Sequence, residues 1–399
     1  MPDTAGVSPG GPAVVLSGAR IVSAGRVRSG PLRLAGGLVD AGEPRRGDHV
    51  VRLDGHLVFP GLLNAHDHLP LNAFPGVPPL GTFPNASGWI AALQPALASE
   101  PSRAARSIPE EVRARHGALK NLLSGTTTAA HHDPLLDVMG RSDFPVRVVS
   151  PFGWCHSLDL AGRYGPPLKE SFRSTPPGAR WFVHLAEGTD AAAGSERERL
   201  DRAGCLGPRT VAIHGVGFSE EDVARVLEAG AHVVWCPASN LSVLGATPAP
   251  GRLLAAGRLA LGTDSRLSGS RDLLEELRAA REASGLPPSA LLRLVTGDAA
   301  GVLGLSAAGR LEPGSPADLV VVPDGGGDPA ASLIETTRSG LLAVVLGGVP
   351  RVAAPELLPW LEAAGAEPQR ARLDGVPKVI DARLFAPEAA ALEPGLELL

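Results

Sequence analysis

Two histidines that stand one residue apart give the first sign of chemistry in this chain. His66 and His68 lie in the stretch VFPGLLNAHDHLPLNAFPG, directly after a run of apolar residues. In a β-strand, residues two positions apart point to the same face, so both imidazoles would face one space. Imidazole is a common ligand of Zn²⁺ and Fe²⁺. The spacing therefore predicts a chelating pair at the end of a strand, whereas a pair of surface or packing histidines is the alternative.

Four more segments end an apolar run with a residue that can bind a metal or transfer a proton. These segments are RWFVHLAE with His184 and Glu187, TVAIHG with His214, VVWCPASN with Asn240, and LALGTDS with Asp264. His184 and Asp264 would each add a ligand to the histidine pair if their strands belong to one barrel. In parallel α/β barrels the catalytic groups gather at the C-terminal ends of the strands. Histidines that only pack in a core have no reason to prefer strand ends, so the positions favour a metal site.

The pattern of apolar residues predicts the elements that hold these side chains. Up to about residue 58, short apolar runs alternate with Gly, Asp and Ser, which is typical of β-strands. From about residue 59, apolar strands alternate with amphipathic helices, as in RTVAIHG followed by SEEDVARVLEAG. Ser219 with Asp222 three residues later is typical of a helix cap, and Gly230 is placed to end that helix. Repeated strand–helix units predict a parallel sheet.

Near residue 307 the sequence returns to a β pattern that resembles the opening strands. The simplest arrangement is a barrel inserted into a small β domain built from both chain ends. We therefore predict residues 1–58 as the first part of that β domain, 59–307 as the barrel, and 308–399 as its second part with a tail. The tail after about residue 355 holds one short amphipathic helix, APELLPWLEAAG, and the sequence assigns it no role.

Composition limits the partners and the compartment. Charged residues make up 20% of the 399 residues and the net charge is -5, so no basic face for nucleic acid is expected. The apolar runs are too short to cross a membrane. Three cysteines at irregular distances disfavour disulfides, and the first residues do not resemble a secretory signal. We expect a cytoplasmic protein with no nucleic-acid and no membrane partner.

Several short motifs together resemble one known family. FPGLLNAHDH, GTTTAAHHD, HLAE, CPASN, GTDS and GRLEPGSPADLVVV are similar to motifs of the amidohydrolase superfamily, in particular its cytosine, guanine, adenosine-like and triazine deaminases. The resemblance covers about residues 13–350. It implies an α/β fold, a distorted (β/α)₈ TIM barrel flanked by a β-sandwich. It also implies one divalent metal ion held by the residues that match its ligands, His66, His68, His184 and Asp264.

Two departures from the superfamily pattern affect these expectations. Many members hold a second metal through a carboxylated lysine on the fourth strand. The only lysines here are Lys120, Lys169 and Lys378, and none ends an apolar strand. We therefore expect one metal ion, with zinc as the first choice and iron as the alternative. The interval between VRVVSPFGWCHS and ARWFVHLAE is short for a full fourth strand and helix, so we expect that region to be shortened.

The resemblance also implies catalytic roles. A divalent metal lowers the pKa of bound water from about 15.7 towards roughly 7 to 9, which makes hydroxide available as a nucleophile. Glu187 would carry a proton from that water to a substrate nitrogen. Asp264 would bind the metal and accept the second proton, and His214 would orient the water or the tetrahedral oxygen. The alternatives are a solvated loop carboxylate for Glu187 and a packed core histidine for His214.

Four further residues are candidates for substrate contacts. His131 and His132 follow GTTTAA at the end of the predicted second strand, and we choose His132 as the one that reaches the pocket. Asn240 could contact the substrate or fix the neighbouring loop. Trp89 and Trp154 lie in or next to predicted loops at the mouth of the barrel, where a flat heterocycle could stack on them.

The sequence therefore predicts a metal-dependent aminohydrolase that releases ammonia from an amino-substituted nitrogen heterocycle. One alternative is hydrolysis of a cyclic amide, as in imidazolonepropionase-like members, and another is dechlorination of a triazine. A catalytically inactive scaffold is disfavoured because all the ligand-matching residues are present. The expected partner is a small-molecule substrate, and a homo-oligomer is an expectation from analogy alone.

Overall fold

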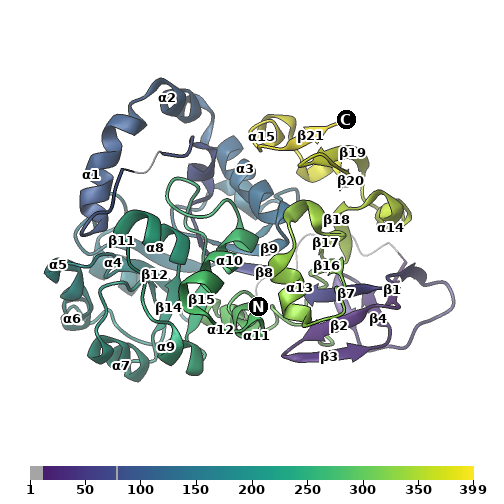
Figure 1. Cartoon of the computed structure of the whole chain (residues 1–399), viewed down its shortest axis with the longest axis horizontal. Coiled ribbons are helices and arrows are strands. Elements are labelled where there is room, and N and C mark those ends of the chain that lie inside the picture. Colours follow the sequence, from purple (N-terminus) through teal and green to yellow (C-terminus); the bar gives the residue numbers. More distant parts are fainter. Residues whose placement is uncertain (1–11, 78–79) are drawn as a thin grey trace.

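The computed structural model describes residues 12–77 and 80–399, and its strands form two regions (Figure 1). In one region, strands from both ends of the chain pack as sheets. In the other, parallel strands alternate with helices that surround them. The predicted metal ligands all come from the second region.

The first region is two packed sheets. A four-stranded sheet has the order β5-β4-β1-β6, with β1 (Val14–Ser17), β4 (Leu32–Ala35), β5 (Leu38–Asp40) and β6 (His49–Arg52). A nine-stranded sheet has the order β21-β19-β20-β18-β17-β16-β7-β2-β3. Its strands are β2 (Arg20–Ser23), β3 (Arg26–Ser29), β7 (His56–Pro60), β16 (Leu319–Pro323), β17 (Ala343–Leu346), β18 (Val349–Ala353), β19 (Pro368–Leu373), β20 (Val376–Asp381) and β21 (Leu396–Leu398).

The nine-stranded sheet joins the two ends of the chain. β7 pairs antiparallel with β16, from Pro60 opposite Leu319 to His56 opposite Pro323. Figure 1 shows the purple N-terminal strands beside the yellow-green C-terminal ones. One apolar core lies between the two sheets, because Leu16 of β1 belongs to the same buried cluster as Leu319.

The second region is a parallel α/β fold of the TIM-barrel type. One sheet has the order β10-β9-β8, with β8 (Leu62–Asp67), β9 (Thr126–His131) and β10 (Arg147–Val148). The other has the order β11-β12-β13-β14-β15, with β11 (Phe152–Ser157), β12 (Arg180–Leu185), β13 (Thr210–His214), β14 (His232–Trp235) and β15 (Leu259–Leu261). The segment after β15 reaches β8, where Thr263 N–H donates to the His66 carbonyl at 3.0 Å.

Helices connect and cover these strands. The α-helices are α1 (Ala86–Leu97), α2 (Glu100–Ser107), α3 (Glu110–Leu123), α4 (Leu168–Ser174), α5 (Ala191–Gly194), α6 (Glu196–Arg202), α7 (Glu220–Glu228), α8 (Pro237–Leu244), α9 (Gly251–Ala255), α10 (Leu273–Ser284), α11 (Pro288–Arg293), α12 (Gly297–Leu303), α13 (Pro329–Glu335), α14 (Leu358–Ala363) and α15 (Pro387–Ala390). The 3₁₀ helices are η1 (Leu69–Ala73), η2 (Asp137–Gly140), η3 (Arg338–Gly340), η4 (Pro355–Leu357) and η5 (Ala382–Leu384). The predicted cap of α7 is confirmed, since Ser219 and Asp222 form a reciprocal capping box.

The expected shortening lies before the fourth strand and not after it. β11 and the helix α4 are both present, but only residues 149–151 separate β10 from β11. Neighbouring parallel strands need a crossover of about a dozen residues or more. β10 and β11 avoid this requirement because β10 pairs with β9 while β11 pairs with β12. One nearly continuous segment therefore serves the edges of both parallel sheets.

The C-terminal tail, to which the sequence assigned no role, is anchored to the second region. The buried Glu393 carboxylate accepts hydrogen bonds from His116 Nε2 in α3 at 2.9 Å and from both terminal nitrogens of Arg266 at 2.9 Å. Arg266 is two residues beyond Asp264. The tail thus braces the segment that follows β15. Within the described residues, no helix has the length and hydropathy needed to cross a bilayer.

Candidate active site

The four predicted metal ligands meet at the C-terminal ends of their strands. His184 Nε2 lies 3.4 Å from the Nε2 atoms of both His66 and His68. Asp264 Oδ1 lies 3.7 Å from each of the latter two nitrogens. All four side chains are buried. Residues that are up to 198 positions apart in the sequence thus direct their donor atoms to one point.

Hydrogen bonds behind the imidazoles direct their free nitrogens to that point. His68 Nδ1 lies 2.8 Å from Asp133 Oδ2, and His184 Nδ1 lies 2.8 Å from the His156 carbonyl oxygen. Both acceptors fix the proton on Nδ1, so Nε2 presents a lone pair to the centre. This partner pattern is the usual one behind metal-binding histidines.

The spacing of the donor atoms fits a metal ion. Zinc binds imidazole nitrogen at about 2.0–2.1 Å, which places two tetrahedral ligands about 3.4 Å apart. The His66–His184 and His68–His184 nitrogen distances are both 3.4 Å. His132 also contributes a donor atom, within 4.8 Å of those of the three histidines. Buried imidazole and carboxylate donors at these distances support a divalent metal.

The backbone at the cluster is strained at two of the predicted site residues. His214 has φ of 76° and Asp264 has φ of 56°, in the left-handed region that non-glycine residues rarely adopt. Such strain persists where the surrounding fold imposes it, and it is common at functional sites. Gly262 lets the segment before Asp264 approach β8, since a Cβ at Gly262 would lie 2.7 Å from the Cβ of His66.

A buried polar network lies beneath the cluster. Asp67, between the two histidines of β8, accepts hydrogen bonds at Oδ2 from Lys120 Nζ at 3.0 Å and from Asn121 Nδ2 at 2.7 Å. Lys120 Nζ also donates to Asn72 Oδ1 at 2.9 Å and to Thr263 Oγ1 at 3.2 Å. The Lys120 and Asp67 side chains are completely buried. This pair links β8 and α3 to the residue that precedes Asp264.

Glu187 and His214 lie together beside the cluster. Glu187 Oε1 is 3.6 Å from His214 Nε2, and the His214 ring stacks on that of His184 with centroids 5.3 Å apart. His214 Nδ1 lies 2.8 Å from Asn240 Oδ1, which orients the ring. Asn240 therefore contacts His214 from behind. Burial raises the pKa of Glu187 above its usual range, against the opposing effect of His214.

The pKa values in the cluster are set by burial and by the carboxylates of Asp133 and Asp264. Burial lowers the pKa of His66 to about 4. Burial also acts to lower the pKa of His68, but Asp133 outweighs it and raises that pKa to about 9. A raised pKa means that His68 carries a proton on both ring nitrogens near neutral pH. Metal binding at Nε2 must displace the proton on that nitrogen. Burial opposes ionisation of Asp264, yet the surrounding histidines hold its pKa far below the usual range.

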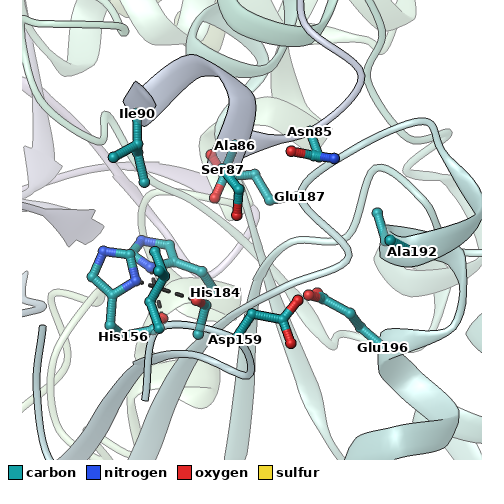
Figure 2. A pocket seen from close by; sticks show the side chains of 13 residues that line it. Asn85, Ala86, Ser87, Ile90, His156, Asp159, His184, Glu187, Ala192 and Glu196 are labelled. Atoms are coloured by element: carbon teal, nitrogen blue, oxygen red, sulfur yellow. Dashed lines mark hydrogen bonds between the residues drawn. The ribbon is translucent and has the colours of Figure 1, made fainter. Parts of the chain in front are cut away.

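A cavity opens beside the cluster from Glu187 and His184 (Figure 2). Besides these two residues its lining is Asn85, Ala86, Ser87, Ile90, His156, Ser157, Asp159, Leu160, Ala192, Ala193 and Glu196. Figure 2 shows Glu187 near Ser87 at the start of α1, while Asp159 and Glu196 face each other on the other side. The cavity therefore joins a candidate proton-transfer group to a lining rich in carboxylates.

The four residues predicted to contact substrate lie outside the lining of this cavity. Trp89, Trp154, His132 and Asn240 are not among the described residues that line this cavity. His132 lies within the metal-capable cluster, and the Trp154 ring meets it edge-on with centroids 5.8 Å apart. Trp89 is half-buried in α1, the helix whose first turn forms part of the lining. Contacts of these four residues with substrate stay predictions.

Sequence reasoning missed three residues that define this site. Lys120 stands in the apolar stretch GALKNLL, so a buried charge could have been suspected from its neighbours. Glu196 and Asp159 carry no comparable signal, because Glu196 lies in a polar run typical of a solvated surface and Asp159 in a mixed segment without a pattern. Only the folded arrangement brings these two carboxylates to one cavity.

Comparisons with known proteins agree with this geometry. Residues 169–350 match the model of the amidohydrolase family. A 5-methylthioadenosine/S-adenosylhomocysteine deaminase of Teredinibacter turnerae is 27% identical over 339 residues, which cover 69% of this chain and 74% of that protein. An 8-oxoguanine deaminase of Pseudomonas aeruginosa is 27% identical over 379 residues, covering 74% of this chain and 82% of that protein.

Solved structures share the fold. An adenosine deaminase from Xanthomonas campestris with bound zinc has a TM-score of 0.64 at 21% identity, covering 86% of this chain and 94% of that one. An atrazine chlorohydrolase from Arthrobacter aurescens in complex with zinc has a TM-score of 0.68 at 21% identity, covering 84% and 94%. Residues 169–350 thus match the amidohydrolase family, and the related deaminases and the shared parallel α/β fold agree with that match.

Proposed function

We propose that this protein is a zinc-dependent deaminase that hydrolyses an amino-substituted nitrogen heterocycle and releases ammonia. The observation that carries the proposal is the convergence of three imidazole nitrogens and one carboxylate oxygen at metal-ligand spacing, with a protonatable carboxyl group next to them. The deaminases among the relatives support the reaction type.

His66, His68, His184 and Asp264 would hold the metal ion. When bound, such an ion supplies a nucleophile at neutral pH by lowering the pKa of water. Asp264 is suited to bind through Oδ1 alone, because its Oδ2 accepts hydrogen bonds from Ser239 at 2.7 Å and Ser268 at 2.8 Å. His132 is a candidate for a further contact with the same site.

Glu187 is the proposed proton carrier. A carboxyl group that delivers a proton near neutral pH needs a raised pKa, and burial raises that of Glu187. Its position in the cavity lining, 3.6 Å from His214 Nε2, would allow contact with both the cluster and a bound ring. Glu187 would carry one proton of the attacking water to the ring nitrogen, and the second proton, accepted by Asp264, would go to the departing amine.

His214 and Asp264 are proposed to assist. Asn240 holds His214 with Nε2 directed towards Glu187, so His214 would accept or donate a hydrogen bond at the reacting centre. Asp264 would accept a proton from the attacking water. The buried and strained positions of both residues favour fixed orientations.

The proposed substrate is a purine, a nucleoside or a similar small heterocycle. The names of the deaminase relatives support this class. Cyclic-amide hydrolysis and triazine dechlorination would use the same residues, so they are outcomes of the test. A small-molecule substrate, a cytoplasmic location and homo-oligomer formation complete the proposal, and the free, buried cysteines are compatible with that compartment.

We also propose the domain limits 1–58, 59–307 and 308–399, with β8 to β15 as the strands of a distorted eight-stranded barrel. The sheet membership of β7 and β16 supports a sandwich from both chain ends. β7 extends to Pro60, so the change from sandwich to barrel falls at Gly61.

The test is ammonia release by zinc-loaded protein from a panel of amino-purines, amino-pyrimidines, pterins and their nucleosides. Chloride release from chlorotriazines and ring opening of cyclic amides are measured in parallel. His66→Ala should abolish both metal content and turnover, whereas His232→Ala, a buried histidine outside the cluster, should retain the metal. Hydrolysis of cyclic amides without any ammonia release would overturn the proposal.

A further inference from the structure

The cavity beside the cluster is lined by carboxylates and, among its described residues, by no lysine or arginine. Three acids, Asp159, Glu187 and Glu196, face it, and the remaining lining is neutral or apolar apart from the histidines. Burial lowers the pKa of His156 to about 4, so this imidazole is uncharged near neutral pH. The acidic groups of the lining therefore face no lysine, no arginine and no charged imidazole within it.

Asp159 has a cationic partner. Its carboxylate forms an ion pair with Arg199 of α6, and both side chains are substantially exposed. Arg199 is not part of the lining. This pair therefore contributes little net charge to the cavity, and exposed pairs of this kind add little stability.

Glu196 differs because it is partly buried and has no ion-pair partner among the described residues. Its Oε2 accepts a hydrogen bond from Ala186 N–H at 2.6 Å, which is the only hydrogen bond to its side chain among those residues. The other oxygen is thus left for the cavity. Withdrawing a carboxylate from water without a cation is costly even when the burial is partial, and such groups are concentrated at functional sites.

Glu187 lies beside the cluster, 3.6 Å from His214 Nε2, whereas Figure 2 shows Glu196 beside Asp159, on the side of the cavity away from His184. A ring bound with its reacting carbon near Glu187 would extend past His156 towards Glu196. Groups on the far edge of that ring would then meet a carboxylate. Carboxylates bind N–H donors and cations, and they repel carboxylates and phosphates.

We propose that Glu196 determines specificity, so that the site accepts a ring whose far edge carries N–H donors or a positive charge and rejects rings bearing a carboxylate or phosphate. The inference rests on the proposed function only for the orientation of the ring. The charge preference itself belongs to the cavity and can be measured without turnover. It predicts nucleobases or nucleosides over nucleotides.

The titration of Glu196 gives this preference a pH dependence. Burial raises the pKa of Glu196 to about 7, partly offset by the Ala186 hydrogen bond and by Arg199 and reinforced by Asp159 and Glu187. Above pH 7 the group is ionised and attracts a cation, whereas below pH 7 it is neutral. The preference for a cation should therefore increase as pH rises through about 7.

Glu196 also has a structural role, and the substitution must separate the two roles. The Ala186 hydrogen bond holds the turn that leads from β12 to Glu187. Glu196→Gln keeps an oxygen acceptor for Ala186 N–H and removes only the charge. Glu198→Gln is the matched control, since Glu198 lies in the same helix α6, is exposed, and pairs with Arg202.

The experiment measures binding of three isosteric probes to zinc-loaded protein by calorimetry at pH 8. Benzamidine is a cation, benzamide is neutral and benzoate is an anion. We expect benzamidine to bind at least about tenfold more tightly than benzamide. Glu196→Gln should remove most of that difference and its increase between pH 6 and pH 8, while Glu198→Gln should leave both unchanged.

Benzamidine binding no tighter than benzamide or benzoate, or an unchanged preference in Glu196→Gln, would overturn the inference. A parallel assay compares ammonia release from aminopurine nucleosides and their 5′-phosphates. A cation preference without ammonia release overturns the deaminase proposal and leaves the charge selectivity. Faster deamination of the phosphates leaves the deaminase proposal and overturns the selectivity.

Discussion

The two sides of the histidine cluster are built in opposite ways. Beneath it, Asp67 and Lys120 are completely buried and each makes several hydrogen bonds to neighbouring side chains. On the cavity side, Glu187 and Glu196 are partly buried, and the described residues offer them few partners. Both sides place charge in a region of low dielectric constant, and only one side compensates it.

This difference assigns different tasks to the two sides. A saturated network resists movement because every displacement breaks hydrogen bonds that water cannot replace. It is suited to hold ligands at fixed distances. Carboxyl groups without partners are costly in the free protein, but they can exchange protons or bind a ligand. Substitutions beneath the cluster should therefore change metal affinity, whereas those in the cavity should change turnover or ligand selectivity.

The largest expected effect is a loss of turnover, and it comes from a substitution on the cavity side. Glu187→Gln keeps the shape of the side chain but cannot carry a proton, so turnover should fall by about 10²–10⁴-fold. Zinc content should stay at the wild-type level, because Glu187 is not one of the convergent ligands. Steady-state ammonia release and elemental analysis check the two halves of this prediction. Wild-type turnover in Glu187→Gln would remove Glu187 from the mechanism.

The next largest effect is expected for the network beneath the cluster. It is tested by the same substitution at two buried lysines, Lys120 and Lys378. Lys120 Nζ contacts Asp67, whereas Lys378 Nζ donates to the Leu341 carbonyl in the sandwich region, far from the cluster in sequence. Lys120→Met leaves the Asp67 carboxylate buried without its cation, which should cost about 3–5 kcal/mol of folding stability. Metal affinity should also fall by about 10–100-fold, as expected for a group that supports ligands.

Lys378→Met provides the control for stability. It should lower the thermal midpoint without changing metal affinity, measured by competition with a chelator. The absorption spectrum of the Co²⁺-substituted protein adds a second readout, because only a change in ligand geometry moves its bands. Equal metal affinity and identical spectra in both variants would show that the Lys120 network supports only the fold.

The contrast between the two sides also explains what the sequence could predict. The histidine pair, His184 and Asp264 follow apolar strands, and strand period and strand end are local properties. The C-terminal ends of parallel strands then lie at one edge of the sheet, however far apart the strands are in the sequence. The capping box of α7 is local for the same reason, and it is confirmed.

The Lys120–Asp67 pair and the Glu196 carboxylate depend on contacts between distant segments. Lys120 is 53 residues from Asp67, and no local pattern states which buried acid a buried lysine will meet. The connection between β10 and β11 is a further case. The sequence predicted a shortened unit after β11, but the structure has α4 there, and strand pairing allows the short connection to fall before β11.

The smallest expected effect is a modest loss of metal affinity, after substitution of the serines that hold the Asp264 carboxylate. Asp264 directs Oδ1 to the histidines, while its Oδ2 accepts hydrogen bonds from Ser239 and Ser268. Ser239→Ala removes one donor and leaves the other, so metal affinity should fall by less than about tenfold. The double variant with Ser268→Ala should lose more than the sum of the single changes, because the carboxylate can then rotate. Strict additivity in chelator competition would mean that backbone strain at Asp264, and not its hydroxyl partners, fixes the carboxylate.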